Sequence, residues 1–147
     1  MTQEMHVSDA GISLTKQCES CRLSAYQDLR GIWTIGYGHT GPDVHAGMVI
    51  TQQEADALLA QDLEVAAEGV RRLVKVPLTQ FQFDALVDFA FNLGVGSLER
   101  STLLRLLNEG KYLLAGGQFP VWDHAGDKVV PGLLARRDAE QRLFFTT

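Results

Sequence analysis

The sequence lacks an apolar run long enough to span a membrane, which takes about 18 consecutive apolar residues. Its first residues, MTQEMHVSDAG, contain neither the basic segment nor the apolar core of a signal peptide, so we expect no secretory leader or signal anchor. Repeats, low-complexity tracts and linkers rich in Pro, Gly or Ser are also missing. We therefore expect one domain over residues 1–147 and no membrane insertion.

Basic residues are in the minority, with 13 Lys and Arg against 18 Asp and Glu and a net charge of -5. This balance disfavours a nucleic-acid-binding protein and a polybasic membrane-surface protein, which both need a cationic face. The excess of acidic over basic residues lies in one segment. Residues 51–70 contain no basic residue and five acidic ones: Glu54, Asp56, Asp62, Glu64 and Glu68. The rest of the chain is balanced, so an anionic substrate is not excluded.

Cysteine is scarce, and the two present, Cys18 and Cys21, form one C-x-x-C with no second pair and no histidine cluster. That pattern is a poor zinc site. The glycines of GIWTIGYG lack the strand-to-helix setting of a dinucleotide motif, so we expect no metal and no cofactor. In a reducing compartment both cysteines are expected to be thiols, with Cys18 at an apolar position. A lesser alternative is an 18–21 disulfide that forms outside the cytoplasm and shifts Glu19.

Most of the patterns in the sequence predict helices. Thr51 with Glu54 forms a capping box that opens a helix over about 51–73, and apolar residues follow at helical spacing. Thr79 with Gln82 opens a second helix, which is apolar on most faces and therefore central and buried, and which Gly94 ends. Ser8 or Ser13 is expected to cap a first helix. Shorter helices are expected near 101–109, 111–117 and 132–145.

Residues 23–40 differ, because they are rich in β-branched and aromatic residues and are interrupted by glycines. Gly31 suits a hairpin turn, while Gly36 and Gly38 suit a bulge or a close backbone approach. The predicted fold is α+β and mostly helical. A small N-terminal β-hairpin lobe and a C-terminal helical lobe, about 12–60 and 61–147, are joined by the long helix, and the cleft between them is the expected ligand site.

Three residues are candidates for catalysis: Glu19, Asp28 and Thr34. Glycoside hydrolysis needs one carboxyl group that donates a proton to the leaving oxygen and a second that is ionised, and a hydroxyl can orient water. If the first helix leads into the hairpin, all three side chains can face one cleft. Taken alone, the pair is a weak signal, because a chain with 18 acidic residues offers many such pairs.

The residues around these three candidates make the catalytic interpretation stronger. Glu, eight residues, Asp, five residues and Thr is the pattern of the phage-type lysozymes, or endolysins, of glycoside hydrolase family 24, and the string RLSAYQDLRGIWTIGYGHT resembles their signature hairpin. The resemblance continues in FDALVDFAFNLGVGSL (83–98) and FPVWDHAGDKVVPGLLARRDAEQRLF (119–144), so that it covers most of residues 12–145.

The resemblance implies a peptidoglycan hydrolase that cuts the β-1,4 bond between N-acetylmuramic acid and N-acetylglucosamine in host-cell lysis. Glu19 would be the general acid, Asp28 the second carboxylate and Thr34 a water-positioning group, with inverting or retaining stereochemistry left open. The protein would be a monomer that stays in the host cytoplasm until a holin, without direct contact, lets it reach the wall. The alternatives are a lytic transglycosylase on the same bond and a non-catalytic wall-binding module.

Other polar residues have two interpretations each. His39 either lines the cleft or anchors the hairpin through hydrogen bonds, which we favour. One of Arg136 and Arg137 either pairs with Glu19 or Asp28, as the resemblance implies, or lies on a solvated helix face with a partner such as Glu140. Asn92 is either a sugar contact or a buried polar group, which we favour.

The aromatic residues are expected to serve packing. Trp33 and Tyr37 alternate with Thr34 along the strand and so share a face with Ile35. The sequence does not decide whether Trp122 serves packing or the site. Four phenylalanines are assigned to the core rather than to a sugar platform: Phe81, Phe83, Phe89 and Phe91.

Overall fold

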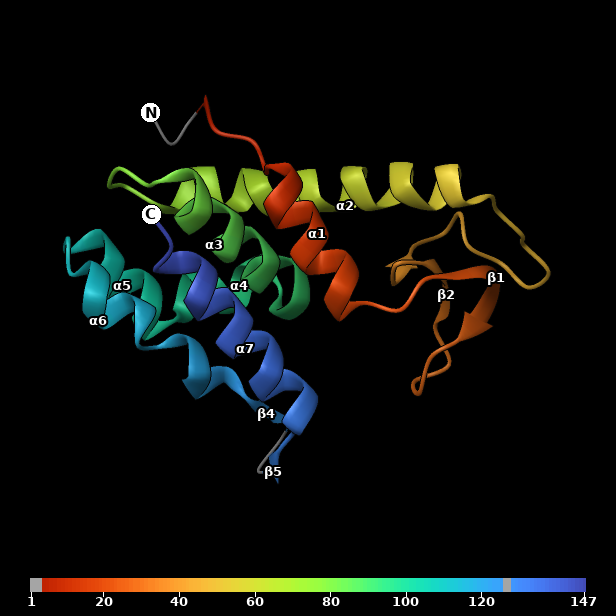
Figure 1. Ribbon diagram of the computed structural model, residues 1–147. Helices are drawn as coiled ribbons and strands as arrows, with labels where there is room; N and C mark the ends of the chain where they lie inside the picture. The colour runs from red at the N-terminus through yellow and green to blue at the C-terminus, as the bar shows by residue number, and fades with distance from the viewer. Residues whose placement is uncertain (1–3, 126–127) are drawn as a thin grey trace.

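A computed structural model describes residues 4–125 and 128–147, and it has a large helical lobe and a small sheet lobe joined along one long helix (Figure 1). The elements are α1 (Asp9–Cys18), β1 (Arg22–Gln27), β2 (Trp33–Gly36), β3 (His39–Thr40), α2 (Gln52–Leu73), α3 (Gln80–Leu93), α4 (Val95–Arg100), α5 (Thr102–Asn108), α6 (Tyr112–Gly116), the 3₁₀ helix η2 (Phe119–Trp122), β4 (His124–Ala125), β5 (Lys128–Val129) and α7 (Pro131–Phe144). The predicted α+β, mostly helical fold is confirmed. None of the described helices is both long and apolar enough to cross a bilayer.

The sheet lobe is an antiparallel sheet in the order β1-β2-β3, with Thr34 opposite Tyr26 on one side and Thr40 on the other. The register shifts between Arg22 and Tyr26, where β1 carries an irregularity. A small core lies beneath the sheet and consists of Ile35, Val44, Ile50 and Ala55. Trp33 and Tyr37 pack against this core, as their alternation with Thr34 predicts.

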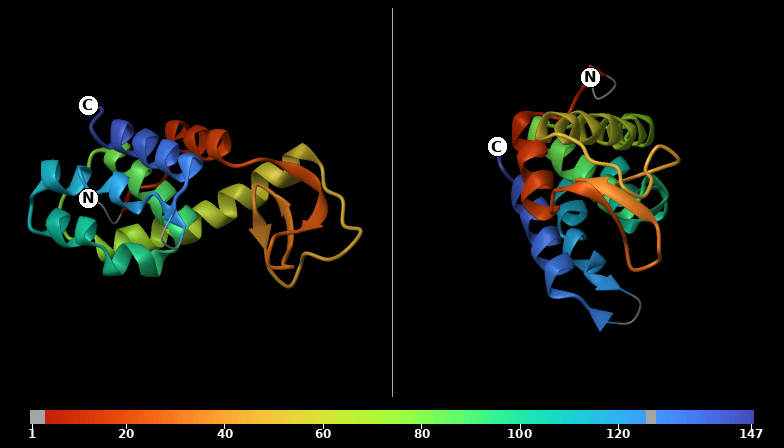
Figure 2. Two further views of the ribbon diagram at one scale, coloured as in Figure 1. Left: turned by 90° about the horizontal axis from the view of Figure 1, so that it is seen from below. Right: turned by 90° about the vertical axis from the view of Figure 1, so that its right-hand side faces the viewer.

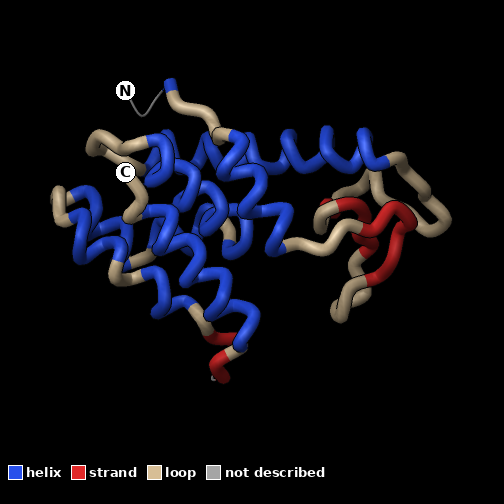
Figure 3. The backbone as a smooth tube through the Cα atoms, in the orientation of Figure 1, coloured by secondary structure: helices blue, strands red, loops and turns tan. Residues whose placement is uncertain are grey.

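The long helix α2 belongs to both lobes. Its N-terminus carries the predicted capping box, in which the Thr51 hydroxyl accepts from the Glu54 backbone N–H and the Glu54 side chain accepts from the Thr51 N–H. Its first turns contact the sheet, and from Leu59 onward its buried residues join the core of the helical lobe. Figure 3 shows this helix extending from beside the sheet into the helical lobe.

Helix α3 lies at the centre of the helical lobe, where α1, α2 and α7 pack around it (Figure 2). The predicted capping box of Thr79 and Gln82 is present, and Gly94 ends the helix with a φ of 94°. Phe89 stacks edge-on against Phe119 and Trp122, so Trp122 serves packing. Phe83 is fully buried like Phe89, and burying each such ring stabilises the fold by about 1.5–3 kcal/mol. The core assignment holds less fully for Phe91, which packs against this core while staying partly exposed, and for Phe81, which is only partly buried.

The first helix begins after Ser8, but the Ser8 side chain does not cap it. The backbone N–H of Ser8 donates to Asp84 Oδ1 at 3.0 Å, and its hydroxyl also donates to that carboxylate, because Asp84 is fully buried on α3 and needs donors. Thus α1 packs against α3 in the helical lobe.

Helix α4 and the antiparallel pair β4–β5 are elements that the sequence patterns did not predict. The lobe limits of about 12–60 and 61–147 stay a prediction.

Candidate functional site

Glu19 lies at the end of α1, where the chain leaves the helix for the sheet lobe. Its backbone N–H still bonds to Thr15 O at 2.9 Å, while its own φ and ψ are already extended. Its Oε2 accepts a hydrogen bond from Arg136 Nη1 at 2.6 Å. Its Oε1 accepts no hydrogen bond from any residue that the structure describes. One carboxyl oxygen is therefore anchored and the other is free for chemistry.

Glu19 lines a cavity of about 440 Å³ between the lobes. The sheet lobe, α2 and the α3–α4 corner each contribute walls, and the other lining residues are Tyr37, Gly38, Thr40, Asp62, Val65, Ala66, Ala90, Phe91, Asn92, Gly94 and Val95. Gly38 lies against the Glu19 carboxyl, since a Cβ on it would be 3.2 Å from Glu19 Oε1. The close backbone approach predicted for Gly38 is thus an approach to Glu19.

Asp28 follows β1 and is held by its own loop. Its Oδ1 accepts the backbone N–H groups of Arg30 at 2.8 Å and Ile32 at 2.9 Å. The hydrogen bond from Ile32, helped by that from Arg30, holds the pKa of Asp28 below its usual value. Asp28 is therefore ionised at neutral pH, and its second oxygen takes part in none of these bonds.

Thr34 lies on β2 and is 4% exposed, and its Oγ1 donates to Ile32 O at 3.0 Å. The hairpin brings it near Asp28, because Tyr26 pairs with Thr34 and the Asp28 N–H bonds to Ile32 O. Neither Asp28 nor Thr34 lines the cavity that contains Glu19. The three candidates thus form two groups, with Asp28 and Thr34 on one hairpin and Glu19 against the β2–β3 turn at Gly38.

Arg136 connects Glu19 to the interior of the helical lobe. It is 6% exposed, and besides Glu19 it donates two hydrogen bonds to Asp88, from Nε at 2.9 Å and from Nη2 at 2.8 Å. Burial alone would lower the pKa of Arg136, but the carboxylates of Asp88 and Glu19 outweigh it and raise that pKa, so the guanidinium is permanently charged. This confirms the pairing of an arginine with Glu19.

The alternative of a solvated face pairing Arg136 with Glu140 is wrong. The ion pair instead joins Arg137 and Glu140, with 2.6 Å between Nε and Oε1, and both residues are fully buried. Arg137 Nη2 also donates to Asn92 Oδ1 at 2.8 Å. Asn92 combines both interpretations, because it is bonded to a buried arginine and also lines the cavity.

Sequence reasoning missed Asp88 and the burial of Glu140. A usable signal existed for Asp88, since a carboxylate within the apolar run FDALVDFAF must be buried and therefore needs a cationic partner. Burial raises the pKa of Asp88, but hydrogen bonds with Glu140 and Arg136 outweigh it and lower the pKa to about 2.

His39 anchors the sheet to α2, as we favoured. Its Nδ1 lies 2.8 Å from Asp62 Oδ2 and its Nε2 lies 3.0 Å from Asp43 Oδ2. Burial lowers the pKa of His39, but the hydrogen bonds with Asp62 and Asp43 outweigh it and raise the pKa above its usual value. Asp62 also lines the cavity, so this contact fixes one wall of it.

Cys18 does not fill an apolar position, which corrects the expectation from the sequence. It is exposed at the last residue of α1, beside the groove between α1 and α7, and both it and Cys21 are free thiols. Burial of its sulfur still raises the pKa of the Cys18 thiol. Within residues 4–125 and 128–147, no cluster of three or more His, Cys, Asp or Glu is placed to hold a metal ion.

Comparison with known proteins identifies one family. A family model described as phage lysozyme matches residues 16–140. The endolysin of Bacillus phage B103 is 46% identical over 144 residues, which cover 97% of this chain and 55% of that protein. The endolysin of Salmonella phage P22 is 43% identical over 146 residues, covering 97% of this chain and 99% of that one. The chain therefore spans about half the length of the Bacillus phage relatives that it matches.

Comparison with solved structures gives the same family. The muramidase domain of SpmX from Asticaccaulis excentricus superposes with a TM-score of 0.93 at 41% identity, covering 98% of this chain and 100% of that domain. A crystal structure of a P22 lysozyme variant superposes with a TM-score of 0.88 at 42% identity, covering 97% of this chain and 99% of that one.

Proposed function

Because the chain belongs to the phage lysozyme family, we propose that it is a peptidoglycan hydrolase that lyses bacterial cells. The observation that carries the proposal is the position of Glu19. Its Oε2 is fixed by Arg136, while its Oε1 faces a cavity between two lobes. A second carboxylate and a hydroxyl, Asp28 and Thr34, lie on the hairpin of the opposite lobe. An acid and an ionised carboxylate in different environments are what glycoside hydrolysis requires.

In this proposal the scissile bond is the β-1,4 bond between N-acetylmuramic acid and N-acetylglucosamine. The Glu19 carboxyl donates its proton to the glycosidic oxygen as the C–O bond breaks. The Asp28 carboxylate, kept ionised by backbone N–H groups, stabilises the positive charge that develops on the sugar ring. Water then adds to the anomeric carbon with its orientation set by Thr34, and a proton returns to Glu19.

The cavity walls suit an N-acetylated glycan. Val65 is 66% exposed on α2, and with Phe91 and Val95 it provides apolar surface for pyranose faces and acetyl methyl groups. Asn92 and Tyr37 line the same cavity, and the Asn92 NH₂ and the Tyr37 O–H are donors from which a glycan could accept.

The acidic segment of α2 is less repulsive toward an anionic wall than its composition suggests. Lys16 Nζ lies 3.2 Å from Asp56, Arg71 Nη2 lies 2.5 Å from Glu64, and His39 contacts Asp62. Three of the five acidic residues between 51 and 70 thus have cationic or ionisable partners that lie outside that segment, on α1, on β3 and in the last turn of α2. Their field at the cavity is reduced accordingly.

The proposal extends to the biological setting. We infer a monomer that acts on the cell wall without inserting into the membrane, binding nucleic acid or using a cofactor. It waits in the host cytoplasm until a holin permeabilises the inner membrane, without direct contact between the two proteins.

The decisive experiment compares Glu19→Gln with wild type in a turbidity assay on bacterial cell walls. We expect the variant to lose at least a hundredfold in rate while its Tm stays within about 2 °C of wild type, because Gln keeps an oxygen that accepts from Arg136 but cannot donate the proton. Glu99→Gln, at an exposed glutamate on α4, is the matched control and should clear walls at the wild-type rate. A wild-type protein that binds walls without clearing them would support a non-catalytic wall-binding module instead.

Product analysis separates hydrolysis from lytic transglycosylation. Hydrolysis leaves a reducing N-acetylmuramic acid end, whereas a transglycosylase leaves a 1,6-anhydro end because no water is added. Asp28→Asn and Thr34→Ala are both expected to lower the rate without changing the product. Anhydro ends in the wild-type digest would overturn the hydrolytic assignment.

A further inference from the structure

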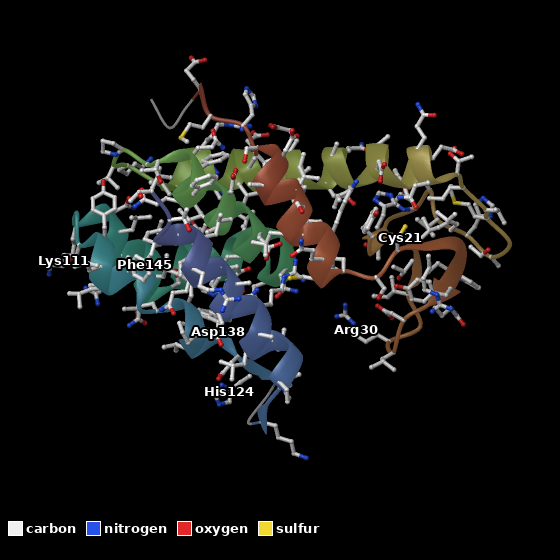
Figure 4. The ribbon with its side chains drawn as sticks, in the orientation of Figure 1. Cys21, Arg30, Lys111, His124, Asp138 and Phe145 are labelled. Atoms are coloured by element: carbon white, nitrogen blue, oxygen red, sulfur yellow. The ribbon has the colours of Figure 1, made fainter. Side chains whose placement is uncertain are left out.

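Asn92 connects the cavity to the interior of the helical lobe. It is the next-to-last residue of α3, is half-buried and lines the cavity that contains Glu19. Arg137 lies behind it on α7, which packs on α3. Figure 4 shows α7 crossing next to the end of α1, with the neighbouring Asp138 labelled. The orientation of the Asn92 amide therefore depends on a contact made in the interior.

The Asn92 amide can meet Arg137 in only one orientation. A guanidinium group has donors and no acceptor, so its partner must be the carbonyl oxygen of the amide and not the NH₂. Arg137 Nη2 donates to Asn92 Oδ1 at 2.8 Å, as this requires. The NH₂ at the other end of the amide donates to no residue that the structure describes. Nor is it one of the buried polar atoms left without a partner within residues 4–125 and 128–147, so it is open to the cavity.

Arg137 is itself held from its other side. It is fully buried, and Glu140, which is also fully buried, pairs with it through both carboxylate oxygens, at 2.6 Å from Nε and 2.8 Å from Nη2. The guanidinium carbon lies 5.3 Å from the centre of the Phe89 ring. Separating this pair would leave a charge unpaired in the interior, so the pair keeps Nη2 directed at Asn92. The Asn92 amide is thus oriented before a ligand binds.

The cavity wall beside Asn92 is apolar. Val95, the first residue of α4, packs directly on α2 because Gly69 has no side chain there, and a Cβ on Gly69 would be 2.6 Å from Val95 Cγ2. Val65 lies one turn earlier on the same face of α2, lines the cavity and is largely exposed. Phe91 adds a further apolar surface to this wall. A ligand group that fits here has an acceptor next to an apolar part.

The charge of the cavity narrows the choice of ligand group. Among the residues that the structure describes, those lining the cavity include the carboxyl groups of Glu19 and Asp62 and no Lys or Arg. An anionic ligand group is therefore disfavoured at this wall, and the acceptor must be neutral. Sugar hydroxyls donate as well as accept and carry no apolar part. The acetamido group of an N-acetylated sugar has a neutral carbonyl that only accepts, with a methyl group beside it.

We propose that Asn92 is a specificity-determining residue, which donates a hydrogen bond from its NH₂ to the carbonyl oxygen of a sugar acetamido group. The acetyl methyl group then lies on the apolar wall of Val65 and Val95. Arg137, held by Glu140, is a positioning residue that keeps the NH₂ directed into the cavity. This inference rests on the proposed function, and it names the group by which the cavity distinguishes an N-acetylated glycan from a deacetylated one.

Asn92→Asp exchanges the donor for an acceptor in a side chain of the same shape. One carboxylate oxygen still accepts from Arg137, while the other repels an acetamido carbonyl and attracts the ammonium group of a deacetylated sugar. We would measure kcat/KM on native cell walls and on the same walls after enzymatic N-deacetylation. Wild type should prefer the acetylated walls about tenfold, and the variant should lose or reverse that preference. The ratio of the two values cancels any effect of the new charge on Glu19.

Gln82→Glu is the matched control, because it makes the same amide-to-acid change on α3 away from the cavity. Gln82 Oε1 accepts from the Thr79 N–H at 2.9 Å, and a glutamate serves equally well in this capping box. Its preference for acetylated walls should equal that of wild type. Asn92→Asp overturns the proposal if it keeps the wild-type preference or slows hydrolysis of both walls by the same factor.

Binding without turnover is measured on Glu19→Gln. The probes are soluble strands of alternating N-acetylglucosamine and N-acetylmuramic acid, freed of peptides, and the same strands after N-deacetylation. In isotope-labelled protein, the side-chain NH₂ resonances of Asn92 should shift with the acetylated strands and stay in place with the deacetylated ones. Those of Gln82 should stay in place with both.

Asn92 resonances that do not move at saturation, or a failure of the acetylated strands to bind, would contradict the assignment. If wild type does not hydrolyse walls, the proposed function fails, while these resonances still decide whether Asn92 binds an acetamido group.

The positioning role of Arg137 is tested by removing both charges of the buried pair, in the double variant Arg137→Met with Glu140→Gln. The Asn92 amide can then turn either way, so the preference for acetylated walls should fall about threefold with Asn92 still present. A folded double variant with the wild-type preference would show that the ion pair does not orient Asn92. The measurement on Asn92→Asp keeps the wild-type ion pair and does not depend on the folding of this double variant.

Discussion

Gly38 offers the sharpest test of the site, because replacing it by alanine places one methyl group against the proposed acid. Gly38 lies between β2 and β3 with a φ of +79°, a conformation that side chains rarely adopt. A Cβ there would be 3.2 Å from Glu19 Oε1, which is tighter than ordinary van der Waals contact. The substitution therefore has a backbone effect and a contact effect.

The two effects can be separated by magnitude. The left-handed backbone costs an L-residue about 1–2 kcal/mol, so Gly38→Ala should lower the free energy of unfolding by that amount. The contact should move the Glu19 carboxyl by a few tenths of an ångström. Since a 1 Å misplacement of a reacting group can cost about a hundredfold, we expect a loss in kcat on the order of fivefold.

Gly110→Ala isolates the backbone effect. Gly110 has a φ of +80° at the turn before α6, and a Cβ there would meet nothing within 4 Å. It should cost the same stability as Gly38→Ala but leave kcat on cell walls unchanged. Equal kcat for the two variants, measured at equal folded fraction, would show that the space next to Glu19 Oε1 has no role in catalysis.

Three further outcomes follow from the structure. The pKa of His39 is raised by Asp62 and Asp43, so its contribution to stability is present below pH 6.5 and is lost as pH rises through the folded pKa; denaturant unfolding of wild type should show this loss and His39→Gln should not. Thr79→Ala removes the capping box of α3 and should lower the unfolding free energy by about 1 kcal/mol with kcat unchanged, whereas a loss below about 0.3 kcal/mol would contradict the cap. Because acidic side chains of α2 are paired, lytic activity should change less than about threefold between low and physiological salt, and a steep decline would contradict it.

The parts of the fold that sequence could predict are those with local signals. The capping boxes at Thr51 and Thr79 fix where α2 and α3 begin, because both partners lie within four residues of each other. The apolar character of α3 on most faces predicts its central position, because such a helix has no side that tolerates water. The spacing of Glu19, Asp28 and Thr34 likewise places a carboxyl at a helix end and two polar groups on a hairpin.

The parts that failed depend on contacts between distant segments. The i, i+4 spacing of Arg136 and Glu140 correctly describes neighbours on a helix, but it cannot tell whether that face meets water or Asp88 on another helix. The apolar position expected for Cys18 followed from the family resemblance, yet α1 ends at that residue and leaves its side chain exposed. In each case the missing information was the packing partner rather than the local conformation.

The two proposed catalytic carboxyls are controlled by different means, and this separates how mutations affect them. Asp28 is held by backbone N–H groups of its own loop, so substituting neighbouring side chains leaves its environment largely intact. Glu19 is held by the side chain of Arg136, which depends in turn on Asp88 across the α3–α7 contact. Because side chains can be replaced while backbone donors cannot, substitutions in the helical lobe should alter the acid, and the ionised carboxylate should remain insensitive to all but changes of loop conformation.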